Sequence, residues 1–181
     1  MPYRGVIDRL SPLLVVAALA GCTTSTTERL GLGPLQTVAA LDLTRYAGTW
    51  YELASYPQSF QEGCSNTTAT YTLRPDGEID VLNRCLKAGE VDDARGRARV
   101  VSPPAKLEVS FFRPFWGDYW VIDLDPDYKT AIVGHPSRDY LWLLSRTPTV
   151  APEVMAGLEE KARQSGYPLE RLRRTAQAAR R

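Results

Sequence analysis

Residues able to do acid–base or nucleophilic chemistry are few in this chain of 181 residues. It has three cysteines, Cys22, Cys64 and Cys85, and one histidine, His135. A single histidine cannot build a zinc site with the usual His and Cys companions, so we expect no metal site. We expect His135, which precedes Pro136, to lie in a solvent-facing turn. The chain contains neither a Gly-rich phosphate loop nor a Gly-x-Ser-x-Gly turn, and we expect no cofactor.

One carboxylate stands apart from the others. Most Asp and Glu residues fall in turns, where they cap backbone groups, whereas Glu52 directly follows Trp50-Tyr51 and is expected to point inward. A buried carboxylate can act as an acid or a base. We expect a protein that binds its ligand without converting it. The alternative is an enzyme that uses Glu52 or a free cysteine, Cys64 or Cys85.

An indole and a guanidinium at opposite ends of the chain are expected to meet. Gly48 allows a tight turn into the stretch that carries Trp50, and Arg146 ends the apolar stretch that begins at Tyr140. A guanidinium can lie flat on an indole and still donate hydrogen bonds to nearby carbonyl groups. We therefore expect Trp50 and Arg146 to seal the closed end of one sheet.

Short strands separated by turn signals fill the chain between these two residues. The Arg74-Pro75-Asp76-Gly77 turn is typical, because Pro presets one dihedral angle and Gly accepts a positive φ. Eight closely spaced strands without helices between them indicate an all-β, antiparallel up-and-down barrel, wide enough for one small ligand. The strands are expected at residues 53–56, 69–73, 79–86, 93–101, 106–111, 119–124, 130–133 and 140–145.

Helical signals occur only at the two ends of this region. Residues 41–47 have the pattern of a single helical turn. After the last strand, Pro152 suits the first position of a helix that Gly166 and Pro168 would end. Its apolar face is expected to hold Val154, Leu158 and Ala162, joined by Met155, and to pack on the outside of the barrel.

Strand alternation predicts which side chains face the interior, starting from an inward Trp50 and an inward Arg146. A set of aromatic and aliphatic side chains with a few polar tips is typical of a small-molecule pocket. The predicted ligand-binding residues are Glu52, Ala54, Tyr56, Tyr71, Val109, Phe111, Tyr119, Val121, Tyr140 and Trp142, with Leu73, Leu107 and Leu144 also inward. Arg95, Arg97 and Arg99 would share one face of a strand, which either attracts an anionic head group or, as we favour, is an exposed outer face.

The first residues have the pattern of an export signal. Arg4 and Arg9 precede a short apolar run that ends in Leu19-Ala20-Gly21-Cys22. This tetrapeptide resembles the bacterial lipobox, which implies cleavage after residue 21 and lipid on Cys22. Thr23, rather than Asp, implies transport to the outer membrane in the lipoproteins that this segment resembles. The alternative is an ordinary secretory signal with an incidental cysteine.

If Cys22 carries lipid, Cys64 and Cys85 are the two cysteines that remain, and we expect them to form a disulfide in an oxidising compartment. The alternative is a free, reactive thiol. We expect a signal peptide at 1–21, the lipidated cysteine and a flexible tether at 22–40, the barrel with its helix at 41–170, and a basic tail at 171–181. The tail either contacts anionic head groups or, as we favour, is a solvated terminus.

The charge of the chain argues against one class of partner. The formal net charge is only +1 at pH 7, whereas a nucleic-acid-binding protein usually carries a strong basic excess on one face. We therefore expect no nucleic-acid partner. The sequence leaves open whether a homodimer forms.

Three motifs in order give a family resemblance between about Leu41 and Gly166. Gly48-Thr49-Trp50-Tyr51-Glu52, the stretch from Asp125 to Ala131 and the stretch from Leu141 to Arg146 resemble the three signatures of the lipocalins. The closest likeness is to the bacterial outer-membrane lipoprotein group, which itself resembles apolipoprotein D. The resemblance implies a cup for a fatty acid or lysophospholipid in envelope lipid maintenance. It also makes an isomerase-like enzyme the alternative, because some lipocalins are enzymes.

Overall fold

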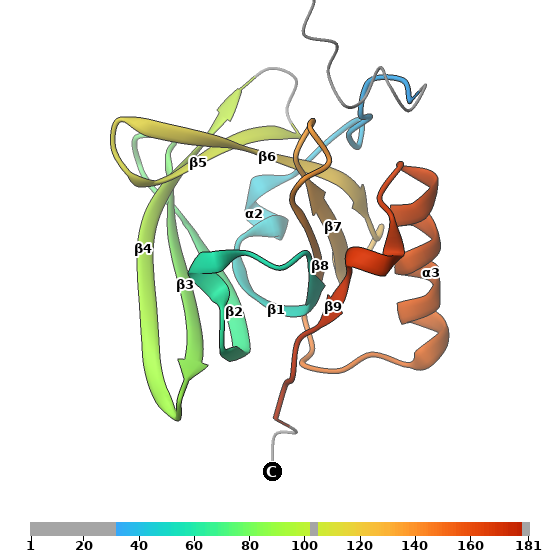
Figure 1. The fold of residues 1–181 in the computed structure, drawn as a ribbon. Helices are drawn as coiled ribbons and strands as arrows, with labels where there is room; N and C mark the ends of the chain where they lie inside the picture. Colours follow the sequence, from blue (N-terminus) through green and yellow to red (C-terminus); the bar gives the residue numbers. More distant parts are fainter. Residues whose placement is uncertain (1–31, 102–104, 179–181) are drawn as a thin grey trace, which may run out of the picture.

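The computed structural model describes residues 32–101 and 105–178. Within them, eight antiparallel strands form a closed barrel, and a ninth strand lies at one seam (Figure 1). Each strand pairs with the next along the chain, and β1 closes the barrel by pairing with both β2 and β8. The predicted eight-stranded up-and-down barrel is confirmed. Its strands are β1 Gly48–Ser55, β2 Cys64–Leu73, β3 Ile79–Lys87, β4 Glu90–Val101, β5 Lys106–Phe112, β6 Phe115–Leu124, β7 Thr130–Gly134 and β8 Leu141–Ser145.

Short helices flank the barrel at its closed end and at its mouth. The predicted helical turn near residue 45 is α2, Leu43–Tyr46, and the Asp42 side chain caps it by accepting hydrogen bonds from two backbone N–H groups. The β1–β2 connection carries a 3₁₀ helix, η1 Ser59–Gln61, and a second one, η2 Leu169–Arg171, follows the long helix. Among the helices that the structure describes, none has the length and apolar content to cross a membrane.

Helix α3, Pro152–Gln164, packs on the outside of the barrel, as expected (Figure 1). Met155, Leu158 and Ala162 are buried on its inner face, which confirms most of the predicted apolar face. The placement of Val154 on that face is wrong, because this side chain is 40% exposed and Met155 takes the buried position.

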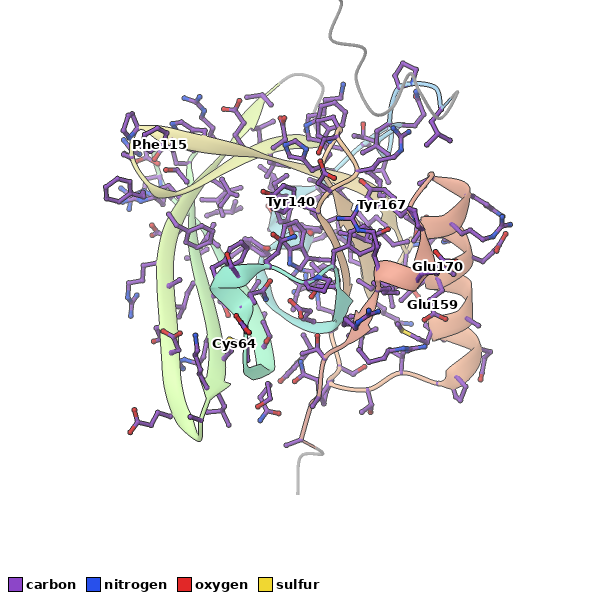
Figure 2. The ribbon with its side chains drawn as sticks, viewed as in Figure 1. Cys64, Phe115, Tyr140, Glu159, Tyr167 and Glu170 are labelled. Atoms are coloured by element: carbon purple, nitrogen blue, oxygen red, sulfur yellow. A yellow bond between two sulfur atoms is a disulfide. The ribbon has the colours of Figure 1, made fainter. Side chains whose placement is uncertain are left out.

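Two apolar clusters hold the fold together. One fills the closed half of the barrel around Trp50 and includes Ile79, Leu107 and Val133. The other lies between the barrel wall and α3. Tyr167 belongs to it, and Figure 2 shows this side chain between the sheet and the helix. The interior of the barrel is therefore packed only at one end, which leaves room at the other.

The first strand contains a β-bulge that corrects two predictions. Glu52 pairs with Leu144 but Ala54 pairs with Leu143, so Leu53 is an extra residue and the alternation of side chains reverses after it. The expectation that Ala54 and Tyr56 point inward is wrong: both side chains lie in the outer cluster under α3.

Part of the expected tether is packed against the barrel. Leu35 is buried in the outer cluster, and the Val38 N–H donates to the Val121 carbonyl over 3.0 Å. Residues 32–40 are therefore not a free tether. The predicted signal peptide, the lipidation of Cys22 and the rest of the tether lie outside the described residues.

The expected C-terminal tail is solvated at its arginine side chains, but the backbone of residues 171–178 is not a free terminus. Arg173–Arg174 form β9, which pairs with Ala54 and Ser55 of β1. Further on, the Asn66 N–H of β2 donates to the Ala176 carbonyl over 2.7 Å. The last described residues thus fill the seam where β1 and β2 separate, next to the mouth of the barrel.

Candidate ligand-binding site

The open half of the barrel contains a cavity of about 320 Å³. Aromatic and aliphatic side chains form most of its wall, and a few polar groups lie among them, as in a small-molecule pocket. The lining residues are Glu52, Phe60, Gln61, Thr67, Thr68, Ala69, Tyr71, Val81, Asn83, Val109, Phe111, Gly117, Asp118, Tyr119, His135, Tyr140, Trp142 and Leu144.

Most of the predicted ligand-binding residues lie on this wall, and their contact with a ligand stays a prediction. They come from five strands and from the β7–β8 connection: Glu52, Tyr71, Val109, Phe111, Tyr119, Tyr140 and Trp142. Val121 also points inward, but it is fully buried in the closed-end cluster below the cavity. With Ala54 and Tyr56 under α3, three predicted residues therefore do not line the cavity.

The closed end is built around the expected Trp50–Arg146 pair. The Arg146 guanidinium carbon lies 3.8 Å from the centre of the Trp50 ring. The same guanidinium donates to the carbonyl groups of Arg45, Tyr46, Ala47, Thr49 and Tyr128 over 2.7–3.3 Å. These acceptors lie on α2, β1 and the β6–β7 turn, so one side chain joins three segments beneath the barrel. Burial lowers the pKa of Arg146 from its ordinary value.

Three tyrosine hydroxyls are linked at the base of the cavity, where Tyr71 and Tyr119 line it and Tyr46 lies in the closed-end cluster. The Tyr119 hydroxyl lies 2.8 Å from the hydroxyl of Tyr46 and 2.8 Å from that of Tyr71. Burial raises the pKa of Tyr71 to about 12 and raises the pKa of Tyr46 and Tyr119 as well. The floor is therefore uncharged over the physiological pH range.

A hydrogen-bond network around Glu52 forms the wall beside the mouth. Its carboxylate accepts hydrogen bonds from the Ser55 hydroxyl at 3.0 Å, from Gln61 Nε2 at 2.8 Å and from the Thr175 hydroxyl. Gln61 in turn accepts from Trp142 Nε1 at 3.3 Å. Glu52 thus ties the β1–β2 connection and the C-terminal segment to the barrel wall.

Sequence reasoning missed several lining residues. Phe60 and Gln61 reach the cavity from η1, within a connection whose path no local pattern predicts. Thr67 and Asn83 lie on strands. Extending the alternation back from Tyr71 along β2 would have found Thr67, and the same alternation along β3 would have found Asn83. The expected turn at His135 is present, but its side chain is only 26% exposed and faces the cavity rather than open solvent. Its ring lines the mouth, with Nε2 3.6 Å from Asp118 Oδ2 and Nδ1 2.8 Å from the Ser137 hydroxyl.

The predicted disulfide between Cys64 and Cys85 is present, with 5.5 Å between the two Cα atoms. It joins the first residue of β2 to β3 near the mouth, and Figure 2 shows Cys64 there. Both sulfur atoms are in the bridge, so neither cysteine is a free nucleophile in this structure.

The three alternating arginines of β4 lie on the outer face. Arg97 Nε lies 3.1 Å from Asp80 Oδ1, and Arg99 Nη2 lies 2.7 Å from Glu108 Oε2. None of the three lines the cavity. Among the described residues, no three His, Cys, Asp or Glu side chains come together in a way that could hold a metal ion.

Comparison with known proteins places this architecture in a family. The model of the lipocalin-like domain matches residues 41–177, which include β9. The chain belongs to the lipocalin family. It is 43% identical over 155 residues to temperature-induced lipocalin-1 of Arabidopsis thaliana, covering 80% of this chain and 83% of that protein. It is 41% identical over 167 residues to outer membrane lipoprotein Blc of Escherichia coli K12, covering 88% and 92%.

Among solved structures, insecticyanin from the tobacco hornworm Manduca sexta shares the fold of this lipocalin. Its TM-score is 0.66 over 81% of this chain and 86% of insecticyanin, at 18% sequence identity. At that identity the likeness concerns the barrel alone.

Proposed function

We propose that this lipocalin binds a single-chain lipid, a fatty acid or lysophospholipid, in its cup. The observation that carries the proposal is the cavity of about 320 Å³ whose wall is largely aromatic and aliphatic. Each methylene group that leaves water for such a wall contributes about 0.8 kcal/mol. An acyl chain would therefore gain most of its affinity in the cup, while its polar group lies near the mouth.

We propose binding and transport rather than catalysis. Glu52 is the carboxylate that an isomerase-like reaction would need, and its oxygens are held by three donors of the protein itself. Both cysteines of the mouth are bonded to each other. These contacts support a fixed wall rather than groups free to react with a ligand.

We further propose that the protein works at the bacterial outer membrane, on its periplasmic face, in the maintenance of envelope lipids. The relative from Escherichia coli is an outer membrane lipoprotein, and Cys22 is the last residue of Leu19-Ala20-Gly21-Cys22, the tetrapeptide that resembles a lipobox. Radiolabelled palmitate should be incorporated into the wild-type chain and not into Cys22→Ser. Equal labelling of both chains would contradict the lipidation of Cys22 and would leave the proposal of ligand binding unchanged.

Binding is tested by titrating the purified full-length Cys22→Ser protein with palmitate and with a lysophospholipid while tryptophan emission is recorded. Trp142 lines the cavity, whereas Trp116 lies outside it under the Arg99 guanidinium. We expect a saturable change in emission that persists in Trp116→Phe and disappears in Trp142→Phe. No saturable change with either lipid, in a folded protein, would refute the proposal.

A further inference from the structure

The charges that line the cavity are almost all negative. Glu52 and Asp118 contribute carboxylates, and no lysine or arginine within residues 32–101 and 105–178 belongs to the lining. In the same part of the chain His135 is the one basic side chain of the lining, and its Nε2 lies 3.6 Å from Asp118 Oδ2. An anionic head group inside the cup would therefore meet like charge in a partly desolvated site, which disfavours binding.

Of the two carboxylates that line the cavity, Glu52 is the one without a basic partner. It is only 5% exposed, and among the described residues it forms no ion pair. Its oxygens accept hydrogen bonds from Ser55, Gln61 and Thr175, which are all neutral donors. Both oxygens therefore act as acceptors, and among the described residues no cation contacts the carboxylate. Arg173 and Arg174 line a neighbouring hollow that Glu52 also borders, and Arg174 pairs with Glu159 at 2.7 Å.

A second, independent feature of the wall is a pair of polar atoms without partners. Thr67 is 7% exposed, and its buried hydroxyl oxygen has no hydrogen-bond partner among the residues that the structure describes. The same holds for the buried side-chain oxygen Oδ1 of Asn83. Both residues line the cavity, on the neighbouring strands β2 and β3. It is costly to leave a buried oxygen without a hydrogen bond, so a rotation of either side chain that brings its oxygen to a hydrogen-bond donor of the ligand would be favourable.

We infer that the cup prefers a single-chain lipid whose polar group donates hydrogen bonds and carries no net negative charge, such as a group that ends in a hydroxyl or an ammonium, over a lipid that ends in a free carboxylate. The inference rests on the proposed function and narrows it: a fatty acid enters the cup but binds less tightly than a neutral or cationic lipid of the same chain length.

The test compares three ligands that share a 16-carbon chain, so that the apolar contribution is common to them. Palmitate, 1-monopalmitoylglycerol and hexadecylamine displace N-phenyl-1-naphthylamine, a neutral fluorescent probe, from full-length Cys22→Ser protein at pH 8. We expect monopalmitoylglycerol, hexadecylamine or both to bind on the order of tenfold more tightly than palmitate.

Two variants distinguish the hydroxyl from the ammonium group. Glu52→Gln replaces the carboxylate by a neutral amide of nearly the same shape. It should lower the affinity for hexadecylamine and raise the affinity for palmitate, with a smaller change in the affinity for monopalmitoylglycerol. Asn83→Leu removes the unbonded acceptor and should lower the affinity for monopalmitoylglycerol. Thr72→Val, on the outer face of β2, is the control and should leave all three affinities unchanged.

The wild-type series decides the inference even if a variant fails to fold. Palmitate binding as tightly as the other two ligands would overturn the inference and leave the proposed function standing. Failure of the probe and of all three ligands to bind a folded protein would overturn both.

Discussion

Replacement of Arg146 by lysine isolates the contribution of the guanidinium at the closed end. Lysine keeps the positive charge but offers three donors from one point, whereas Arg146 donates to five backbone carbonyl groups spread around it. At least two of these hydrogen bonds must therefore be lost. The flat stacking of the guanidinium on the Trp50 ring, at 3.8 Å, is lost with them.

The expected cost follows from these contacts. A hydrogen bond to a charged group contributes about 1.5–3 kcal/mol, and part of that is regained because some of the carbonyl groups are reached by water. A cation–π contact near the surface adds about 0.5–1 kcal/mol. We therefore expect Arg146→Lys to lower the free energy of unfolding by about 3 kcal/mol, with the native barrel retained.

Urea unfolding followed by far-ultraviolet circular dichroism measures this cost, with an unchanged slope as evidence that the transition remains two-state. The matched control is Arg99→Lys. That guanidinium also stacks on an indole, 4.1 Å from Trp116, and also pairs with a carboxylate, but it lies on the outer face of the barrel. The control should cost less than about 1 kcal/mol. Equal costs for the two variants would refute the argument that Arg146 holds the closed end together.

Three further changes test other parts of the structure. Gly134→Ala should lower the free energy of unfolding in urea by about 2 kcal/mol, because an added Cβ would clash with the Tyr167 hydroxyl. Gly157→Ala is the control: nothing lies within 4 Å of the added Cβ, so this change should raise the free energy of unfolding by up to about 1 kcal/mol. Reduction of the disulfide, which closes a loop with a sequence separation of 21, should lower the free energy of unfolding by about 3 kcal/mol, and an unchanged urea midpoint in dithiothreitol would contradict this. Burial raises the pKa of Tyr71 to about 12, so the folded state holds a proton that the unfolded chain releases above pH 10. Stability is then full below pH 10 and falls by up to about 1.4 kcal/mol per pH unit toward pH 12, and Tyr71→Phe should fall less steeply over that range.

The barrel was predictable because its strands follow local rules. Alternation of side chains and turn residues such as Pro75 and Gly77 specify where strands run and end, and both signals lie within a few residues of one another. The Trp50–Arg146 contact was predictable for a different reason, since few side chains can both stack on an indole and bond several carbonyl groups.

The errors come from contacts between distant segments. Nothing in the residues around Leu53 signals a bulge, and the Leu53 carbonyl accepts a hydrogen bond from the Thr175 N–H near the other end of the chain. The bulge that moves Ala54 and Tyr56 under α3 is thus accompanied by a contact with the C-terminal segment. Gln61 likewise reaches the cavity from a connection that a bond to Glu52 joins to β1. Strand periodicity carries no information on either contact.

The proposal that lipid binds inside the cup is tested most directly by filling the cup. Ala69 lines the cavity, and an indole at this position would occupy much of its open volume. Thr72 lies on the same strand and on the outer face, so Thr72→Trp is the matched control. Isothermal titration of a lysophospholipid into each folded variant should show affinity reduced at least about tenfold in Ala69→Trp and unchanged in Thr72→Trp. Full affinity in Ala69→Trp would show that the lipid binds elsewhere on the protein and would contradict the account.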